Sequence, residues 1–428
     1  MQISEFIEDL KWRGLFQDMV AGTEEYLNSE NASGYIGFDP TADSLHLGSF
    51  QQIILLKRMQ LAGIRPIALM GGATGRVGDP TGKTEERQLL DNESLQKNID
   101  GIKKQLSKFI QFGNGPKDAL LVDNYDWFKD WTFLDFIREV GKHITVGYMM
   151  SKDSVQNRLE TGLSFTEFTY QLIQGYDFLH LFDTYKCKLQ MGGSDQWGNI
   201  TTGVELIRRI KGEKGFAITS PLVTRADGSK FGKTASGENI WLDPEKTSPY
   251  KFYQFLLNRS DEEAKDLLRR FSFKDRETIK AHEIAHLEVP HLRLLQKALA
   301  EELTILVHSE SDLETAQKAS QILFGTADME ALQSLSIQTI EEIFEGVPQH
   351  QINRSQIDEG MEIISFLVEG TKIFNSNGQA RQKVGENAIS INKQKINLEK
   401  QIDKNDLLHN QYILVQQGKK NYFLVHIQ

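Results

Sequence analysis

The stretch that decides the fold spans residues 35–49 and reads YIGFDPTADSLHLGS. Residues 35–38 predict a short strand that ends before Pro40, and Ser44 is a good N-cap for a helix that follows. Apolar side chains then recur at helical spacing, at Leu45, Ile53, Ile54 and Leu56. The stretch therefore predicts a strand that leads directly into a helix.

A strand that leads into the start of a helix favours anion binding. The first turn of a helix has unpaired N–H groups, and the positive end of the helix dipole points beyond the strand tip. His46 is predicted to lie in that first turn. Gly48 follows closely and, having no side chain, would let a flat ligand approach the backbone.

The tetrapeptide His46-Leu47-Gly48-Ser49 resembles the first nucleotide-binding motif of class I aminoacyl-tRNA synthetases, which is usually His-Ile-Gly-His. Its neighbourhood resembles the bacterial tyrosyl-tRNA synthetases. Ser49 stands where the motif has its second histidine. The resemblance implies catalytic roles for Thr41 and His46, and ATP contacts for Gly37, Asp39, Gly48 and Ser49.

A second glycine-rich segment, residues 227–234, reads DGSKFGKT. Two ammonium groups three residues apart on such a loop can reach a polyphosphate and stabilise the charge that develops on it. The segment resembles the second class I motif, Lys-Met-Ser-Lys-Ser, in its Lys-Phe-Gly-Lys form. The resemblance implies that Lys230, Lys233 and Thr234 surround the departing pyrophosphate.

The loop of residues 71–84 is also rich in glycine and follows a predicted strand at 66–70. Its spacing does not fit a Walker P-loop, because the position that would need the first glycine is Val77. The resemblance instead implies that Lys83 and Arg87 approach the pyrophosphate from a mobile loop, and that Asp79 binds tyrosine.

Residues 164–180 predict a helix whose apolar stripe comprises Phe165, Phe168, Leu172 and Leu179. Tyr170, Gln174 and Asp177 are spaced i, i+4 and i+7, so they share another face. Such a row of polar groups suits a ligand with polar groups at both ends. The resemblance implies that Tyr170, Gln174 and Asp79 hold the α-amino group of tyrosine, and that Asp177 and Tyr35 hydrogen-bond its phenol.

Residues 189–199 predict a strand end with two glycines, followed by a helix. The resemblance implies ribose contacts for Gly193 and Asp195, a contact of Gln196 with the reacting carboxyl group, and an adenine contact for residues 221–223, including Leu222. Because strands and helices alternate and the sites fall at strand ends, the sequence predicts a doubly wound, Rossmann-like parallel sheet.

The remainder of the chain divides by composition. We predict a catalytic domain over residues 1–246, a helical domain over 247–325 on the anticodon side, an acidic linker over 326–355 and a small α+β domain over 356–428. Residues 372–428 carry 9 Lys and Arg against 4 Asp and Glu, a net +5 on a chain of net −10. The last domain resembles the S4-type RNA-binding fold. Residues predicted to meet RNA phosphate are Arg381, Lys383, Lys393, Lys395, Lys419 and Lys420.

Length and composition agree with a multidomain enzyme of 428 residues. The N-terminus has no basic segment followed by an apolar run, and the single Cys187 excludes a disulfide framework within the chain, so we expect a cytoplasmic protein without a membrane segment. The sequence shows no metal-ligand cluster, so we expect no protein-bound metal; Mg²⁺ is expected to accompany ATP.

The resemblance covers nearly the whole chain and implies the activity of a tyrosine–tRNA ligase, which activates tyrosine with ATP and transfers it to tRNA(Tyr). The resemblance also implies a homodimer. Two alternatives stay open: the tryptophanyl relative, which the Tyr35 and Asp177 pair disfavours, and a catalytically impaired synthetase-like protein that binds or splices RNA. Intact His46, Lys230 and Lys233 speak against the second alternative, and Ser49 speaks for it.

Overall fold

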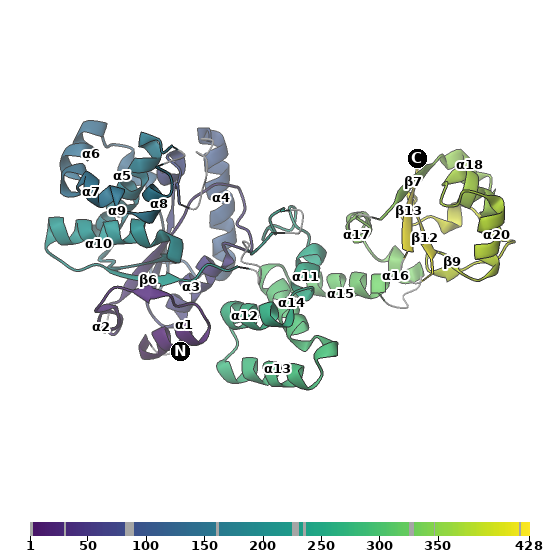
Figure 1. The fold of residues 1–428 in the computed structure, drawn as a ribbon, viewed down its shortest axis with the longest axis horizontal. Coiled ribbons are helices and arrows are strands. Elements are labelled where there is room, and N and C mark those ends of the chain that lie inside the picture. The colour runs from purple at the N-terminus through teal and green to yellow at the C-terminus, as the bar shows by residue number, and fades with distance from the viewer. Residues whose placement is uncertain are drawn as a thin grey trace. The chain divides into compact units, whose positions relative to one another are not determined.

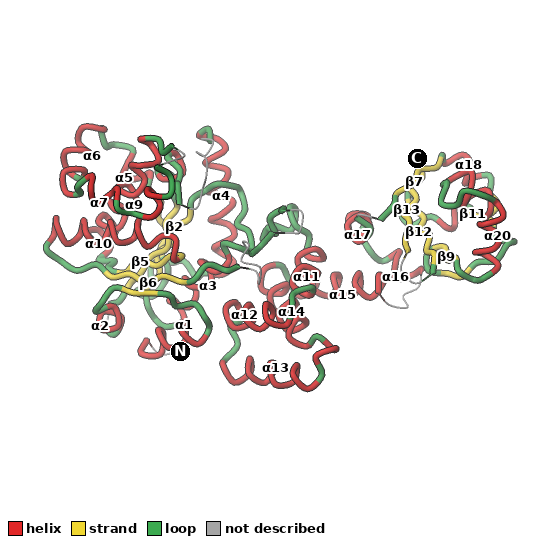
Figure 2. The backbone as a smooth tube through the Cα atoms, viewed as in Figure 1, coloured by secondary structure: helices red, strands yellow, loops and turns green. Residues whose placement is uncertain are grey.

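The computed structural model describes residues 3–29, 31–81, 90–159, 162–224, 231–233, 237–324, 329–345, 347–418 and 421–428. The chain forms two compact units (Figures 1 and 2). The first comprises Met1–Thr247 and Asn258–Leu299, and the second Ser248–Leu257 and Ala300–Gln428. Each unit has a sheet and a hydrophobic core of its own.

The first unit is built on a six-stranded sheet in the order β1-β6-β5-β2-β3-β4. All neighbours are parallel except β1, which is an antiparallel edge strand. Its strands are β1 (Asp18–Met19), β2 (Ser33–Phe38), β3 (Arg65–Met70), β4 (Leu120–Asp123), β5 (Leu189–Gly193) and β6 (Phe216–Ser220). The order reverses between β2 and β5, and ligands of such sheets bind at this point. The predicted doubly wound fold is confirmed.

Helices cover both faces of this sheet because the side chains of each strand alternate between the faces. Tyr35 of β2 and Leu69 of β3 pack with Phe178 of α9 (Phe165–Tyr185) in one hydrophobic cluster. The neighbouring residue, Gly34, faces the opposite side of the sheet. A Cβ built on it would lie 2.9 Å from the Met59 sulfur of α3 (Phe50–Leu61).

The remaining helices of the first unit are short except for α4 and α10. They are η1 (Ile3–Glu5), α1 (Phe6–Trp12), α2 (Thr23–Leu27), η2 (Thr74–Arg76), α4 (Asn92–Phe109), α5 (Tyr125–Phe128), α6 (Phe133–Glu139), η3 (Gly141–His143), α7 (Val146–Met150), α8 (Asp153–Gln156), η4 (Ser194–Gln196), α10 (Trp197–Lys211), α12 (Asp261–Phe271), α13 (Arg276–Glu288) and η5 (Pro290–Leu292). The residues of α14 (Leu294–Val307) are divided between the two units.

The first predicted helix begins later than its sequence indicates. Its N-cap position is Ser49, not Ser44, so His46 lies before α3 and not in its first turn. The Ser44 hydroxyl accepts a hydrogen bond from Gln105 Nε2 (2.8 Å) and donates one to Leu45 O (2.8 Å). Ser44 is therefore used in a tertiary contact with α4 and caps no helix.

Residues 45–47 do not form a helix because they pair with residues 240–242. The Leu47 N–H donates to Ile240 O (2.7 Å), and the Leu242 N–H donates to Leu45 O (2.9 Å). A backbone that forms these bonds cannot form helical ones. The predicted helix 164–180 is confirmed as α9, although Phe165 is 64% exposed and does not belong to the buried stripe.

The second unit combines helices with a five-stranded sheet in the order β10-β9-β12-β13-β7. Its helices are α11 (Pro249–Leu257), α15 (Glu310–Phe324), α16 (Met329–Gln333), α17 (Ile337–Ile343), α18 (Arg354–Asp358), α19 (Ile363–Ser365), the π-helix η6 (Phe366–Gly370), α20 (Asn377–Gly385) and η7 (Lys404–Asp406). Its strands are β7 (Gln349–Ile352), β8 (Met361–Glu362), β9 (Ile389–Ile391), β10 (Gln394–Lys395), β11 (Gln401–Ile402), β12 (Tyr412–Gln417) and β13 (Asn421–Ile427). β8 and β11 form a separate two-stranded ladder.

The α+β character predicted for the C-terminal part is confirmed. The structure adds that β7 pairs with β13, the last strand, in parallel register. This sheet therefore begins at Gln349, within the segment predicted as an acidic linker. The division into domains at residues 247, 326 and 356 stays a prediction.

Candidate active site

A cavity of about 310 Å³ opens at the carboxyl ends of β2 and β5, where the strand order reverses. Most residues predicted to bind tyrosine or ATP line it: Tyr35, Gly37, Asp39, Thr41, Ser49, Asp79, Tyr170, Gln174, Asp177, Gly193, Asp195, Gln196 and Leu222. The lining does not include His46, Gly48 or Lys233. Lys83, Arg87, Lys230 and Thr234 lie outside the described residues.

Helix α9 forms one wall of the cavity, and two separate interactions hold its N-terminus. Ser164 and Glu167 form a capping box, in which each side chain accepts a hydrogen bond from the backbone N–H of the other. The Glu167 carboxylate also accepts two hydrogen bonds, both of 2.9 Å, from the buried Arg158 guanidinium. Because bidentate pairs are geometrically specific, the helix is held in one rotation. That rotation directs Tyr170, Gln174 and Asp177 to the cavity, as predicted.

The deep end of the cavity holds Asp177, which is almost fully buried. Its carboxylate accepts hydrogen bonds from Asn124 Nδ2 (3.0 Å) and Trp127 Nε1 (3.0 Å). Burial raises the pKa of the Asp177 carboxyl well above its ordinary value, and the two N–H donors act in the opposite direction. Burial, with the charge of Asp177, also raises the pKa of the Tyr35 phenol.

Several buried oxygen atoms at the cavity have no hydrogen-bond partner among the described residues. They are the Tyr35 hydroxyl and the amide oxygens of Gln52, Gln174 and Gln190. Buried polar atoms of native proteins are nearly always paired, so unpaired ones around a cavity indicate a polar ligand. The cavity therefore suits a molecule with several hydrogen-bonding groups.

Two other carboxylates that line the cavity accept hydrogen bonds from neighbouring side chains. Asp39 accepts hydrogen bonds from the Tyr170 hydroxyl (2.8 Å) and the Thr74 hydroxyl (2.8 Å). Asp79 accepts one from Gln196 Nε2 (2.7 Å). Negative charge here suits an ammonium group, and Gln196 bridges this region to the end of β5.

Sequence reasoning missed several polar residues of this site, four of which have clear roles or positions. Asn124 and Trp127 hold Asp177, while Thr74 and Gln190 line the cavity. Asn124 also donates to the Thr74 hydroxyl (3.1 Å), so it connects the loop after β3 to α9. Its position directly after β4 is a signal that could have found it, because the carboxyl ends of parallel strands share one edge.

The two class I motifs meet through a short ladder of backbone bonds. Residues 45–47 pair with 240–242, and the Ile240 N–H in turn donates to Gly232 O (2.8 Å). Isolated bridges join His46 to Trp241 and Lys233 to Asn239. The ladder thus brings together segments that are almost two hundred residues apart in sequence.

Gly48 and Gly232 permit this close approach. A Cβ on Gly232 would lie 2.6 Å from Gly48 N, and the φ of Gly232 is +88°, which favours glycine. A Cβ on Gly48 would lie 3.1 Å from Phe231 O and 3.0 Å from the His46 ring. Gly48 was predicted to admit a ligand; in the structure it admits the second motif.

The polar groups at this junction are His46, Ser49 and Lys233. The Ser49 hydroxyl lies 3.4 Å from each ring nitrogen of His46, and Ser49 lines the cavity. Lys233 is exposed. Within the part of the chain that the structure describes, no group of His, Cys, Asp and Glu side chains is arranged to hold a metal ion.

Comparison with known proteins identifies this architecture. A family model described as class I tRNA synthetases (W and Y) matches residues 27–325. A model of the tyrosine–tRNA ligase C-terminal domain matches residues 339–425. The tyrosine–tRNA ligase of Flavobacterium johnsoniae is 54% identical over 99% of this chain and 100% of its own. That of Bacteroides thetaiotaomicron is 55% identical over 98% of this chain and 99% of its own. The chain belongs to the class I tyrosyl-tRNA synthetase family.

Solved structures agree with this family. A C-terminally truncated mitochondrial tyrosyl-tRNA synthetase from Aspergillus nidulans aligns with a TM-score of 0.67 and 30% identity, and covers 74% of this chain and 94% of its own. A tryptophanyl-tRNA synthetase from Encephalitozoon cuniculi shares the fold, with a TM-score of 0.55 at 13% identity. The synthetase fold is therefore shared with tryptophanyl enzymes, whereas the sequence is that of the tyrosyl ones.

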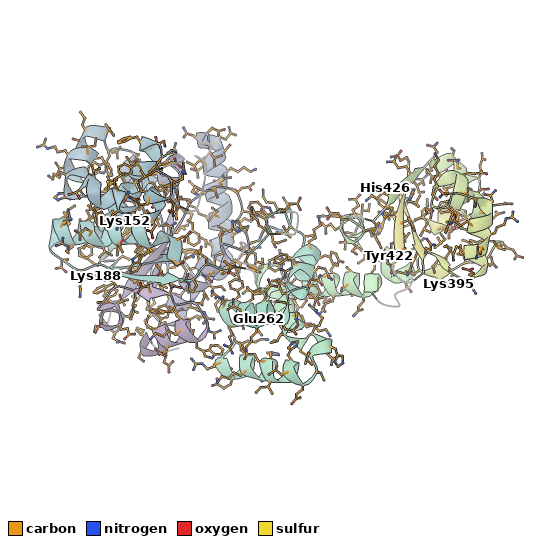
Figure 3. All side chains as sticks on the ribbon, in the orientation of Figure 1. Lys152, Lys188, Glu262, Lys395, Tyr422 and His426 are labelled. Carbon is orange, nitrogen blue, oxygen red and sulfur yellow. The ribbon has the colours of Figure 1, made fainter. Side chains whose placement is uncertain are left out.

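In the C-terminal part of this synthetase, the predicted RNA-binding residues that the structure describes lie on α20 and at or beside β10, an edge strand of the sheet. Arg381 and Lys383 lie on α20, and Lys383 pairs with Glu386 (2.8 Å). Lys395 donates to Asn387 O (2.7 Å), just beyond the end of α20. Lys395 and Tyr422 lie toward the same end of the sheet and His426 toward the other (Figure 3).

Lys393 donates to the Tyr422 hydroxyl (2.7 Å), so this ammonium group is held over a ring of β13, an inner strand of the sheet. Lys419 and Lys420 lie outside the described residues. Among the helices that the structure describes, none combines the length and apolar character needed to cross a membrane.

Proposed function

We propose that the chain joins tyrosine to its tRNA in two steps within the cavity between β2 and β5. A carboxylate oxygen of tyrosine attacks the α-phosphorus of ATP, the bond to the β-phosphate oxygen breaks, and pyrophosphate leaves. A hydroxyl of the terminal tRNA ribose then attacks the carbonyl carbon of the adenylate, and AMP leaves. Family membership and the full-length relatives named tyrosine–tRNA ligases support this activity.

Recognition of tyrosine is the best supported part of the proposal. Its phenol would donate to Asp177 and accept from Tyr35, whose hydroxyl otherwise has no partner among the described residues. Its ammonium group would lie among Asp79, Tyr170 and Gln174, and its carboxylate near Gln196. The buried, unpaired hydroxyl of Tyr35 beside Asp177 is the observation that carries this assignment. A phenyl ring would leave this hydroxyl unpaired, and an indole, which has only a donor, could not accept a hydrogen bond from it.

For ATP, we propose that the ribose and adenine lie along Gly193, Asp195 and Leu222, at the ends of β5 and β6. Gly37, Asp39 and Ser49 would line the path of the phosphates, and Thr41, His46 and Lys233 would stabilise the departing pyrophosphate. Lys83, Arg87, Lys230 and Thr234 would complete this set. Mg²⁺ would enter with ATP and balance the phosphate charge.

For transfer, we propose that the S4-like part, with Arg381, Lys383, Lys393, Lys395, Lys419 and Lys420, binds tRNA(Tyr) through its phosphates. The proposed domain limits stay those given by composition: 1–246, 247–325, 326–355 and 356–428. We also propose a cytoplasmic location, supported by the reduced, buried Cys187.

The proposed homodimer has a candidate surface on the first unit. An apolar groove of about 590 Å³ lies between α6, α7 and the start of α9. Large apolar side chains at or beside it are more than half exposed: Phe133, Leu134, Val146 and Phe165. Exposed apolar patches of this kind mark interaction sites.

A second copy of the chain is the occupant that we propose for this groove. The neighbouring charges alternate in sign along α6 and η3, at Asp135, Arg138, Glu139 and Lys142. Such a row can pair with its own copy across a twofold axis. Phe133→Asp should give monomers in light scattering, whereas Leu287→Asp, at a site 76% exposed on α13, should not. A wild-type monomer at micromolar concentration would contradict the proposal.

The activity is tested by measuring the exchange of pyrophosphate into ATP with each of the twenty amino acids in turn. Exchange with tyrosine alone is the expected result. Exchange with tryptophan would favour the tryptophanyl alternative, and tRNA binding without any exchange would favour the catalytically impaired RNA-binding protein.

A further inference from the structure

The C-terminal end of α12 contacts the segments assigned to ATP. We call residues 269–272 the α12 terminus; they lie in the first unit, far in sequence from every residue assigned to the site. Three kinds of contact converge there: aromatic, amide-mediated and guanidinium-mediated. All three reach α3, and the first two also lead to the second motif and to the segment before Leu222.

The aromatic contact joins both class I motifs. The Phe271 ring lies edge-on to Phe50, the first residue of α3 after the first motif, with ring centroids 5.4 Å apart. Its centroid lies 6.3 Å from that of Phe231, which belongs to the second motif. Phe50 and Phe271 are fully buried, and Phe231 is 4% exposed. Phe271 therefore fills the space in which the two motifs are held together.

The amide-mediated contact reaches the adenine side. Arg270 Nη1 donates to Gln51 Oε1 (3.3 Å), while Gln51 Nε2 donates to Ser220 Oγ (2.9 Å) and Pro221 O (2.8 Å). Pro221 precedes Leu222, which lines the cavity. The Gln51 amide is buried, so its orientation is fixed by its partners at both ends.

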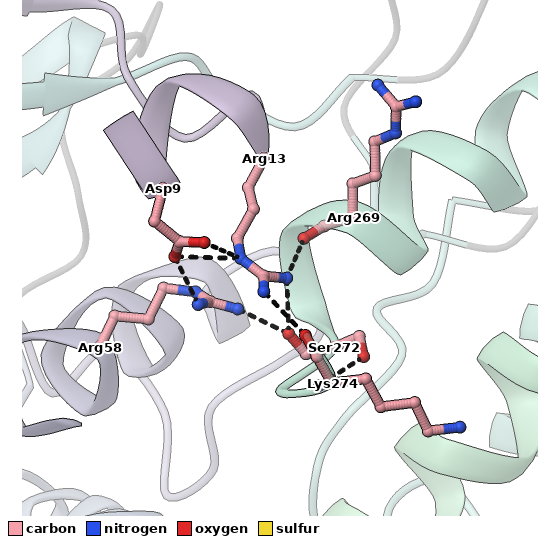
Figure 4. A network of polar contacts seen from close by, with 6 residues as sticks. All are labelled: Asp9, Arg13, Arg58, Arg269, Ser272 and Lys274. Atoms are coloured by element: carbon pink, nitrogen blue, oxygen red, sulfur yellow. Dashed lines mark hydrogen bonds and ion pairs between the residues drawn. The ribbon is translucent and has the colours of Figure 1, made fainter. Parts of the chain in front are cut away.

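The guanidinium-mediated contacts attach the backbone of the α12 terminus to α3 and α1 (Figure 4). Ser272 O accepts from Arg58 Nη2 (2.6 Å) and Arg13 Nη1 (3.0 Å). Arg13 Nη1 also donates to Arg269 O (2.9 Å). Asp9 accepts from Arg13 Nε (2.9 Å) and from Arg58 Nη1 (2.8 Å), so one carboxylate holds both nearly buried guanidinium groups.

These guanidinium contacts also serve the end of the helix. The last carbonyl groups of a helix lack partners within it and carry the negative end of its dipole. Arg13 and Arg58 satisfy carbonyls there with charged donors, which are stronger than neutral ones. The α12 terminus is thus fixed against α3, the helix that directly follows His46 and Ser49.

We infer that the α12 terminus is a positioning element for the ATP half of the site, and that Phe271 and Arg270 are positioning residues for adenylate formation. This inference rests on the proposed function. Phe271 sets the distance between the two motifs. Arg270, through Gln51, fixes the segment that precedes Leu222 at the proposed adenine site. The tyrosine half has a different anchor, the Arg158–Glu167 pair at the start of α9.

The first test compares Phe271→Leu with Phe109→Leu in the full-length protein. Phe109, on α4, also packs edge-on against Phe50 (5.5 Å) and is 6% exposed, so it is a matched core phenylalanine. Phe271→Leu should raise the KM for ATP in pyrophosphate exchange, or lower kcat, by about two- to ten-fold. Its tyrosine dissociation constant should stay at the wild-type value, and Phe109→Leu should leave both ATP parameters unchanged.

The second test compares Arg270→Met with Arg269→Met. Arg269 pairs with Glu283 (2.5 Å), whereas Arg270 pairs with Asp266 (2.8 Å) and also reaches Gln51. Both variants lose one ion pair of the first unit, but only Arg270→Met loses the link to Gln51. Only Arg270→Met should raise the KM for ATP.

The outcomes distinguish a failure of the proposed function from a failure of the inference about the α12 terminus. If wild-type protein gives no tyrosine-dependent exchange, the proposed function fails. If wild-type protein is active but Phe271→Leu and Phe109→Leu change ATP and tyrosine parameters alike, Phe271 is only a core residue and the inference is wrong. Equal effects of Arg269→Met and Arg270→Met would remove the role of Arg270.

Discussion

Replacing Tyr35 with phenylalanine should change stability and tyrosine binding in opposite directions. The Tyr35 side chain is 1% exposed, and its hydroxyl has no hydrogen-bond partner among the described residues of the ligand-free protein. Leaving a buried hydroxyl unpaired costs about 1–3 kcal/mol. Tyr35→Phe should therefore unfold at the same temperature as the wild type or at a higher one.

Tyrosine binding should weaken in the same variant. The hydrogen bond to the substrate phenol is lost, and a neutral bond of this kind contributes about 0.5–1.5 kcal/mol. The dissociation constant for tyrosine should rise about two- to twelve-fold, whereas that for phenylalanine should stay constant or fall. The ratio of kcat/KM for the two amino acids, measured by pyrophosphate exchange, should narrow accordingly.

Tyr26→Phe provides the matched control. The Tyr26 hydroxyl donates to Ser33 O (2.9 Å) and accepts from the Ser33 N–H (2.9 Å), and it does not line the cavity. Its loss should lower the melting temperature and leave tyrosine binding unchanged. If Tyr35→Phe lowered stability as much as Tyr26→Phe did and kept the tyrosine/phenylalanine ratio, Tyr35 would be only a core aromatic residue.

Three further predictions concern other parts of the molecule. Lys233→Ala should slow adenylate formation in stopped-flow measurements with little change in tyrosine affinity; equal weakening of tyrosine binding would contradict its assignment. Because burial raises the pKa of Asp177 in the folded state, the folded protein keeps a proton that the unfolded chain has lost. The free energy of unfolding should thus fall as pH rises from about 3.9 towards the raised value, and Asp177→Asn should flatten that slope in urea titrations. Arg381→Gln, at an exposed position on α20, should lower the salt dependence of tRNA binding by about one unit of log–log slope; an unchanged slope would exclude Arg381 from the interface.

Local patterns predicted the strands and the binding face of α9 because these depend on periodicity. Tyr170, Gln174 and Asp177 share a helix face at any rotation, and the parallel sheet follows from alternating elements. The Gly-Gly strand end likewise fell where predicted, at the end of β5.

The errors and omissions have a common physical origin in distant contacts. Ser44 has the chemistry of an N-cap, but the pairing of residues 45–47 with 240–242 overrides that local preference. Asn124 and Trp127 acquire their roles only because the fold places them beside Asp177, about fifty residues further along the chain. The spacing between these residues and Asp177 carries no signal for the contact; only the place of Asn124 directly after a strand does.

The Arg158–Glu167 pair that anchors α9 affects which substitutions this protein can accept. Arg158 and Glu167 fix the helix from a buried position that does not line the cavity. Substitutions at positions 170, 174 and 177 therefore alter the groups offered to a substrate without releasing the scaffold that carries them. Directed evolution toward non-natural tyrosine analogues should accept changes at these three positions and reject changes at the anchor.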